Sequence, residues 1–260
     1  MWLVKGLVWV FVTLVLVCLV AIGALWGVKV HERSRAESLL KKGLWGISLT
    51  LIVICLVEFG MLWGLTIRGR NRAQAFLSDV VKLELGKATF AEAQQLALKH
   101  GGIPANDGLR CSSESCVFRF VFENKPLTSA RLVPYTRFSS MVSVKNGLVV
   151  ERDILYERQP NRSDPFAYSL TDNSLSSDNQ WWQHFRQTGL WRLNVDERGV
   201  PRLLQVSLGP SSTADQRKRA YALDLSCLSR LFGCNSPTAV FPPDIPYRAT
   251  PYYQTRSETW

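Results

Sequence analysis

The sequence has few of the residues that most often carry enzyme chemistry. It has three histidines, His31, His100 and His184, and it lacks Gly-x-Ser-x-Gly, His-Glu-x-x-His and any glycine-rich phosphate loop. Acidic residues are also scarce, with 21 Asp and Glu against 31 Lys and Arg, which gives a net charge of +10. We therefore expect no catalytic residues, no metal and no cofactor, and a binding role in preference to an enzymatic one.

Charge is missing from one long stretch near the N-terminus and almost missing from a second. Residues 6–28 hold no charged side chain, and residues 44–67 hold only Glu58. At about 1.5 Å per residue, each stretch would cross a hydrocarbon core of about 30 Å. We predict a transmembrane helical hairpin over residues 1–67, with a connection over residues 29–43. A cleaved signal is the alternative for the first stretch, but its apolar run is longer than a signal requires.

Glu58 is the most unusual residue of this hairpin, because a carboxylate at membrane depth is costly. Placing Val28 level with Leu44 in an antiparallel hairpin brings Glu58 beside Thr13. We expect a protonated Glu58 that is hydrogen-bonded to Thr13, or to a second copy of the chain in a homo-oligomer. Docking of Glu58 into a larger membrane complex is an alternative.

The cysteines outside the apolar stretches form two close pairs, Cys111 with Cys116 and Cys227 with Cys234. Neither pair is Cys-x-x-Cys, and no nearby histidine completes a zinc site. We favour two local disulfides over a zinc site or free thiols, and hence an oxidising compartment outside the cytosol.

The basic residues support the same orientation. The first helix is preceded by Lys5 alone and followed by a connection with five basic residues, Lys29, Arg33, Arg35, Lys41 and Lys42. By the positive-inside rule this connection faces the cytosol, so both termini and the domain lie outside. Basic residues also follow the second helix, but a long domain crosses a membrane largely regardless of such charge.

The positive charge favours anionic neighbours, and we expect membrane lipids together with a protein partner or an anionic surface polymer. Nucleic acid is disfavoured, because no recognised binding motif is present. The one basic run, residues 216–219, is predicted to be a solvated loop.

The predicted fold is a membrane-anchored α+β protein, with one domain over residues 68–236 in which leading helices precede an antiparallel sheet. Apolar residues at helical spacing predict a helix over residues 70–85. A second helix is predicted to begin at a capping box of Thr89 and Glu92 and to end at Gly101.

Alternation with a period of two predicts the strands. Three phenylalanines alternate with other residues over 117–123, which indicates a strand with a buried phenylalanine face. Asn146-Gly147 between two alternating runs predicts a tight hairpin turn. A second hairpin is predicted over residues 191–208 and a last strand over residues 221–225, followed by a helical turn that joins Cys227 to Cys234.

Two stretches are predicted to be irregular. Residues 159–180 are rich in Ser, Asn, Asp and Pro and are expected to form a long surface loop. Residues 237–260 form a proline-rich tail, which we expect to be held against the domain by Phe241, Tyr252 and Tyr253.

An aromatic group next to the predicted loop, Trp181, Trp182 and His184, is the candidate binding patch, although ordinary core packing would also explain it. The function that we expect is that of a non-enzymatic, membrane-anchored envelope protein. The enzymatic alternative is a membrane-tethered hydrolase that uses His184 with Asp172 or Asp178.

Overall fold

The computed structural model describes residues 35–105, 111–129, 132–159, 166–174, 190–195, 200–230, 234, 236 and 239–243. Several predicted features lie outside these residues: the first apolar stretch with Thr13, the aromatic group Trp181, Trp182 and His184, Asp178, and the tail beyond residue 243. The chain divides into two compact units, residues 1–65 with 126–132, and residues 66–125 with 133–260.

Helix α2, Arg35–Val80, is 46 residues long and contains the predicted second span. It is the one helix in the described part of the chain that is long and apolar enough to cross a membrane, with a mean hydropathy of 2.1 in its most apolar window. The prediction of a separate helix over residues 70–85 is wrong, because those residues continue α2 as far as Val80. No proline precedes Pro104, so nothing in the sequence forces a break between the two.

Helix α3, Phe90–His100, has the predicted ends. The Thr89 side chain and Glu92 form a capping box, and Gly101 closes the helix with a left-handed φ of 73°. Both ends of α3 were therefore correctly predicted from local sequence chemistry.

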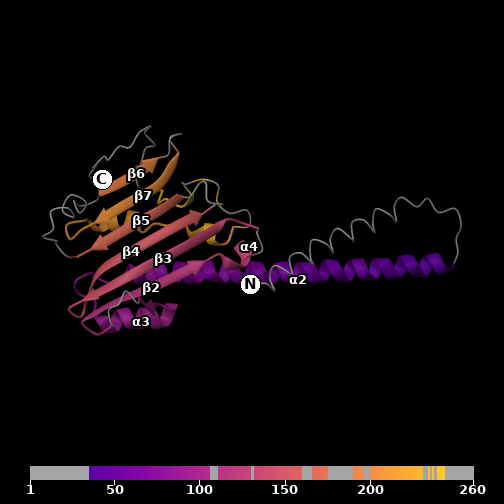
Figure 1. Cartoon of the computed structure of the whole chain (residues 1–260), viewed down its shortest axis with the longest axis horizontal. Coiled ribbons are helices and arrows are strands. Elements are labelled where there is room, and N and C mark those ends of the chain that lie inside the picture. The colour runs from indigo at the N-terminus through magenta and orange to yellow at the C-terminus, as the bar shows by residue number, and fades with distance from the viewer. Residues whose placement is uncertain are drawn as a thin grey trace. The chain divides into compact units, whose positions relative to one another are not determined.

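The second unit is built on a seven-stranded sheet in the order β1-β2-β3-β4-β5-β7-β6 (Figure 1). The strands are β1 Ile103–Pro104, β2 Ser115–Glu123, β3 Tyr135–Lys145, β4 Leu148–Gln159, β5 Phe166–Asn173, β6 Leu190–Val195 and β7 Pro201–Leu208. Neighbouring strands are antiparallel except for β5 and β7, which are parallel. The predicted purely antiparallel sheet is thus wrong at one pair, because β6 takes the edge and β7 inserts beside β5.

Both predicted hairpins are present. Asn146 and Gly147 join β3 to β4 with φ values of 52° and 76°, in the left-handed region that such a two-residue turn requires. Strands β6 and β7 pair antiparallel, as predicted.

Two local predictions are wrong. Strand β5 runs through the predicted loop over residues 159–180. The predicted strand over residues 221–225 is instead a turn that leads into the 3-10 helix η1, Leu225–Leu228. The Asp224 side chain accepts a hydrogen bond from the Ser226 N–H at 2.8 Å, and this cap starts the helical turn.

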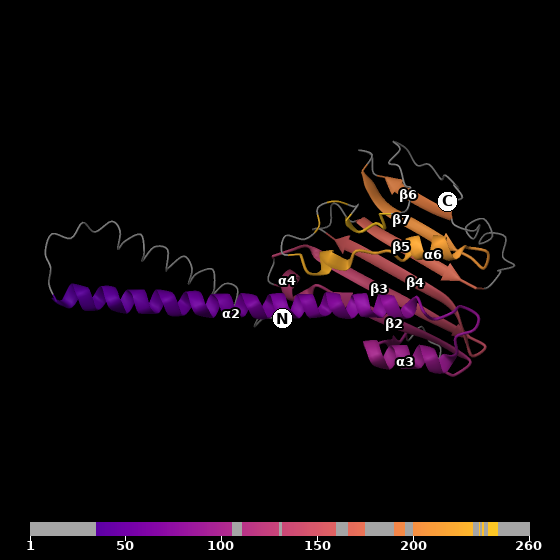
Figure 2. The same ribbon diagram turned by 180° about the vertical axis from the view of Figure 1, so that it is seen from behind.

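The core lies on one face of the sheet. Residues 66–80 of α2, together with α3, η1 and the short helix α6, Ala214–Ala220, pack on that face, and Figure 2 shows α2 and α6 in front of the strands. Phe76 of α2 is fully buried, and its ring centroid lies 4.4 Å from that of Phe120 and 5.5 Å from that of Phe122. The predicted phenylalanine face of β2 is therefore the face that α2 covers.

Candidate functional site

The domain holds two disulfides, which pair the cysteines as predicted. The Cα atoms of Cys111 and Cys116 are 4.4 Å apart, and those of Cys227 and Cys234 are 5.5 Å apart. Among the described residues, Cys55 on α2 is the one free cysteine.

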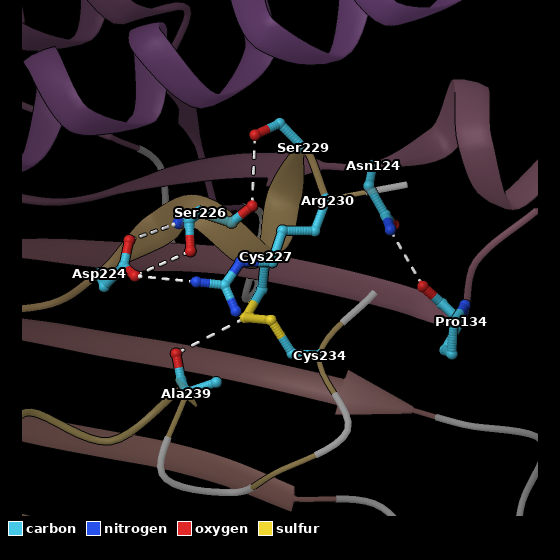
Figure 3. Close-up of a disulfide and its surroundings, with 9 residues drawn as sticks. All are labelled: Asn124, Pro134, Asp224, Ser226, Cys227, Ser229, Arg230, Cys234 and Ala239. Atoms are coloured by element: carbon cyan, nitrogen blue, oxygen red, sulfur yellow. Dashed lines mark hydrogen bonds and ion pairs between the residues drawn. A yellow bond between two sulfur atoms is a disulfide. The ribbon is translucent and has the colours of Figure 1, made fainter. Parts of the chain in front are cut away.

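The second disulfide secures the chain after η1 (Figure 3). The Cys227 sulfur lies 3.5 Å from the Ala239 carbonyl, and the next two residues, Val240 and Phe241, are buried in the core. Phe241 thus packs against the domain as expected, so the folded domain extends beyond the predicted boundary at residue 236.

The first disulfide closes a loop beside the β3–β4 turn and the start of α3. These three segments line a shallow, open depression with a volume of about 580 Å³. Its lining residues are Thr89, Phe90, Ala91, Ser113, Glu114, Asn146 and Gly147. We call this surface the turn-end depression.

Backbone hydrogen bonds hold the walls of the turn-end depression together. The Phe90 N–H donates to the Gly147 carbonyl at 2.9 Å, and the Gly147 N–H donates to the Glu114 carbonyl at 3.2 Å. The turn therefore bridges α3 and the disulfide loop, and the depression has a fixed shape with both apolar and polar walls.

The segment that holds the predicted aromatic patch is attached at the same end of the sheet. Ser174, the last described residue before it, donates its N–H to Val150 near the β3–β4 turn at 2.9 Å. Leu190, the first described residue after it, pairs with Ser207 near the same end of β7. Ser174 and Leu190, the described residues on either side of the segment that includes Trp181, Trp182 and His184, therefore both lie at the turn end of the sheet.

A buried polar network lies beneath the end of α2. One nitrogen of the Arg152 guanidinium, Nη1, donates to the carbonyls of Val80, Val81 and Leu83 at 2.8, 3.1 and 3.1 Å. Its Nη2 is ion-paired with Asp172, which is fully buried. This arginine joins β4 and β5 to the last residue of α2, Val80, and to the two residues Val81 and Leu83 that follow the helix.

Two further residues complete the network around Asp172. The Arg217 Nε donates to it at 3.3 Å, and the Tyr221 hydroxyl also donates at 3.3 Å. Burial raises the pKa of Tyr221 well above its usual range, so its hydroxyl remains a donor. Arg152 also lies over the Tyr221 ring, 5.1 Å from its centroid. The partners of the Asp172 carboxylate therefore all come from within the domain.

The network bears on two predictions. Asp172 is bound by Arg152, Arg217 and Tyr221, and His184 lies outside the described residues, so the pairing of the two in a hydrolase stays a prediction. The basic run over residues 216–219 is not a solvated loop, because it belongs to α6 and Arg217 binds Asp172 and the carbonyls of Ser212 and Gly209.

His100 is a packing residue that links α3 to α2. It is buried, its Nε2 lies 3.0 Å from the Asp79 carboxylate, and its ring meets the edge of Phe76 at 5.5 Å. Hydrogen bonds from Lys99, His100 and Lys82 hold the pKa of Asp79 well below its usual range. This cluster fixes two helices and presents no open reactive group.

The opposite face of the sheet has a pair of neighbouring carboxyl groups on β4, Glu151 and Asp153. Burial, and then the negative charge of Glu151, raise the pKa of Asp153 to about 7. Thr171 on β5 bonds to Asp153, and Asn173 donates to Glu151. Within the described residues, no group of three His, Cys, Asp or Glu side chains could hold a metal ion.

Glu58 lies on the apolar part of α2 and is half-buried.

A scan of the chain against models of protein families gives no match, and no curated protein and no solved structure matches the chain.

Proposed function

We propose that this chain is a non-enzymatic membrane protein of the cell envelope, whose disulfide-bonded domain lies outside the cytosol and binds another protein. One observation carries the proposal: the domain holds two disulfides, and the chain enters it directly from a helix able to span a membrane. Such disulfides persist in oxidising compartments and are rare in the cytosol.

The anchor requires a second span to place the domain outside while the connection faces inward. The uncharged residues 6–28 supply it, and the basic residues of the connection over 29–43 agree with the positive-inside rule. Membrane lipids are therefore the constant neighbours of the apolar part of α2.

The turn-end depression is the surface that we assign to the partner. It combines the Phe90 ring with exposed polar groups at Ser113, Glu114 and Asn146, and the disulfide holds one of its walls. A preformed, mixed surface of this kind suits a protein partner, because little ordering entropy is lost on binding.

An anionic surface polymer is a weaker candidate for the partner. The basic run on α6 offers it little, because Arg217 is bound within the Asp172 network and Arg219 pairs with Asp215 at 2.7 Å. An accessory subunit of a membrane complex would use the same depression and is a form of the protein-binding role.

The sidedness is tested by thiol labelling of whole cells that express a variant with Cys18 and Cys55 replaced by Ala. A membrane-impermeant maleimide-polyethylene-glycol should label the four domain cysteines only after reduction. Labelling without reductant, and only after lysis, would place the domain in the cytosol and end the proposal.

The binding surface is tested with a photo-cross-linking amino acid at Glu114, which is exposed at the depression. Lys218, exposed on α6, is the matched control position. We expect one protein adduct of defined mass from position 114 and none from position 218. Equal adducts from both positions, or none from either in cells, would argue against a protein partner at this surface.

A further inference from the structure

The connection between β2 and β3, residues 125–132, belongs with the apolar helix and not with the rest of the domain. Residues 126–132 form one compact unit with residues 1–65. The connection begins with the short helix α4, Lys125–Ser129, which Figure 2 shows beside α2. Leu127 of α4 is buried, but among the described residues the core on the sheet does not include it. The described neighbour of α4 in its unit is the apolar part of α2.

The level of α4 along α2 follows from the chain lengths on either side of one ring contact. The ring centroids of Phe76 and Phe122 lie 5.5 Å apart. Leu127 follows Phe122 by five residues, a reach of at most about 17 Å. Leu65 precedes Phe76 by 11 residues of helix, or about 16 Å. Leu127 can therefore reach the level of Leu65 but not the middle of the apolar stretch.

The surface of α2 changes from apolar to charged at this same level. Leu65 is the last large apolar side chain that α2 exposes, and Arg68, less than one turn later, is exposed and basic. Trp63 precedes both, and indole rings favour the headgroup zone. If α2 spans a membrane, as the proposed function requires, it leaves the hydrocarbon between Leu65 and Arg68.

Two side chains of the connection point to what it meets at that level. Leu132 is 47% exposed, and its N–H donates to the Leu127 carbonyl at 3.0 Å, which fixes it close to α4. Lys125, at the other end, is exposed and ion-paired with Glu123 at 2.7 Å. We propose that residues 125–132 rest on the membrane surface, with Leu132 among the phospholipid chains just below the headgroups and Lys125 facing the headgroup phosphates.

Continuity and charge favour lipid over a protein as the occupant of this surface. The exposed side chains of α2 up to Leu65 are apolar and already require lipid neighbours under the proposed function. Just beyond them, Arg68 and Arg72 are exposed, and residues 59–78 contain no Asp or Glu. Basic residues beside a span are attracted to anionic headgroups, and a leucine at the boundary of the acyl chains is buried on contact.

The test is fluorescence quenching of the full chain in nanodiscs of phosphatidylcholine and phosphatidylglycerol. With Cys18 and Cys55 replaced by Ala and the domain cysteines bridged, a bimane label reacts only with an introduced cysteine. Leu132→Cys reports the proposed contact. Leu98→Cys is the matched control, because Leu98 is an apolar residue of α3 that is 80% exposed. Leu56→Cys, at an exposed position in the middle of the apolar stretch, reports the span.

A nitroxide lipid labelled near its headgroup should quench the label at position 132 at least about twofold more than the label at position 98. Iodide in the water should show the reverse order. Equal quenching at positions 132 and 98, with position 56 quenched by lipid, would overturn this inference and leave the anchor intact. Absence of lipid quenching at position 56 would instead refute the span and, with it, the proposed function.

The occupant in cells is identified with a photo-cross-linking amino acid at position 132, in cells grown with radioactive phosphate. We expect radioactive phospholipid attached to the chain at the mass of the monomer, and no such label with the cross-linker at position 98. A protein adduct at position 132 in place of lipid would overturn the assignment of this surface to the membrane.

Discussion

Replacing Asp172 with Asn should strongly destabilise the domain. Asp172 is the anionic partner of Arg152, whose side chain is only 4% exposed and cannot recover its hydration. Asn has no charge, and its amide group would place N–H donors against the donors of Arg152, Arg217 and Tyr221. Removing one partner of a buried ion pair costs about 3–5 kcal/mol. Arg217 is partly exposed and can be hydrated, so we expect a loss of about 3–4 kcal/mol.

The loss can be measured on the full chain in detergent by urea unfolding, followed by near-ultraviolet circular dichroism. With a slope of about 2 kcal/mol per molar urea, the midpoint should fall by about 2 M. Asp215→Asn is the matched control, because it makes the same change in an exposed ion pair with Arg219. Such surface pairs contribute about 0.5 kcal/mol or less. Equal shifts in the two variants would refute the assignment of a buried network.

Three further variants test other parts of the domain by the same urea assay. Replacing Cys111 and Cys116 together with Ser should cost about 2 kcal/mol, the entropy of a short closed loop, and an unchanged midpoint without reductant would mean that the bridge does not form. The raised pKa of Asp153, about 7 against a usual 3.8, means that the folded state holds its proton more tightly than the unfolded state. The contribution of Asp153 to stability therefore falls as pH rises from 4 to 7. Asp153→Asn should be stabilising by about 1–2 kcal/mol at pH 8 but not at pH 4. A difference in stability between the variant and the original protein that does not change with pH would contradict this. Gly102→Ala would bring a Cβ into a clash with the Phe120 ring and should cost about 1–3 kcal/mol, whereas a neutral result would show that the ring can move.

The features that the sequence predicted well are those in which local chemistry and burial agree. The capping box at Thr89, the Asn146-Gly147 turn and the alternating phenylalanines of β2 each have one low-energy solution, which the sheet accepts without change. The short spacings within the two cysteine pairs similarly gave each cysteine one nearby partner for a disulfide.

The wrong predictions concern segments whose structure is determined by contacts between residues that are distant in the sequence. Strand β5 looks like a loop because Ser, Thr, Asp and Asn fill half of its eight positions, although Phe166, Tyr168 and Leu170 alternate inward. The alternation of Tyr221 and Leu223 suggested a strand, but the Asp224 cap starts a helical turn there. The parallel pairing of β5 with β7 depends on which strand fills the sheet edge, and no local pattern encodes that choice.

The buried network was missed, although the sequence contains a signal for it. Arg152 lies in phase with Ile154 and Tyr156, and Asp172 lies in phase with Leu170, so both charges occupy inward positions of their strands. Charges of opposite sign in the buried phase of two strands indicate a buried pair, but this signal can be used only once residues 166–173 are recognised as a strand. The third partner, Arg217, follows 45 residues later on α6, and only the fold brings it close.

The geometry of this network indicates what the buried charges do for the fold. Buried ion pairs add little stability compared with apolar residues of the same size, so their retention calls for another reason. Here one guanidinium nitrogen donates to the carbonyl of Val80, the last residue of α2, and to the carbonyls of Val81 and Leu83 just after it, while the other nitrogen is held by Asp172. A shift of α2 by one residue along its axis would rotate the Val80 carbonyl by about 100° and move it away from the buried arginine. We infer that the network sets where α2 ends and which way it faces on the sheet, a specificity that the apolar contacts of Phe76 with several similar rings do not supply.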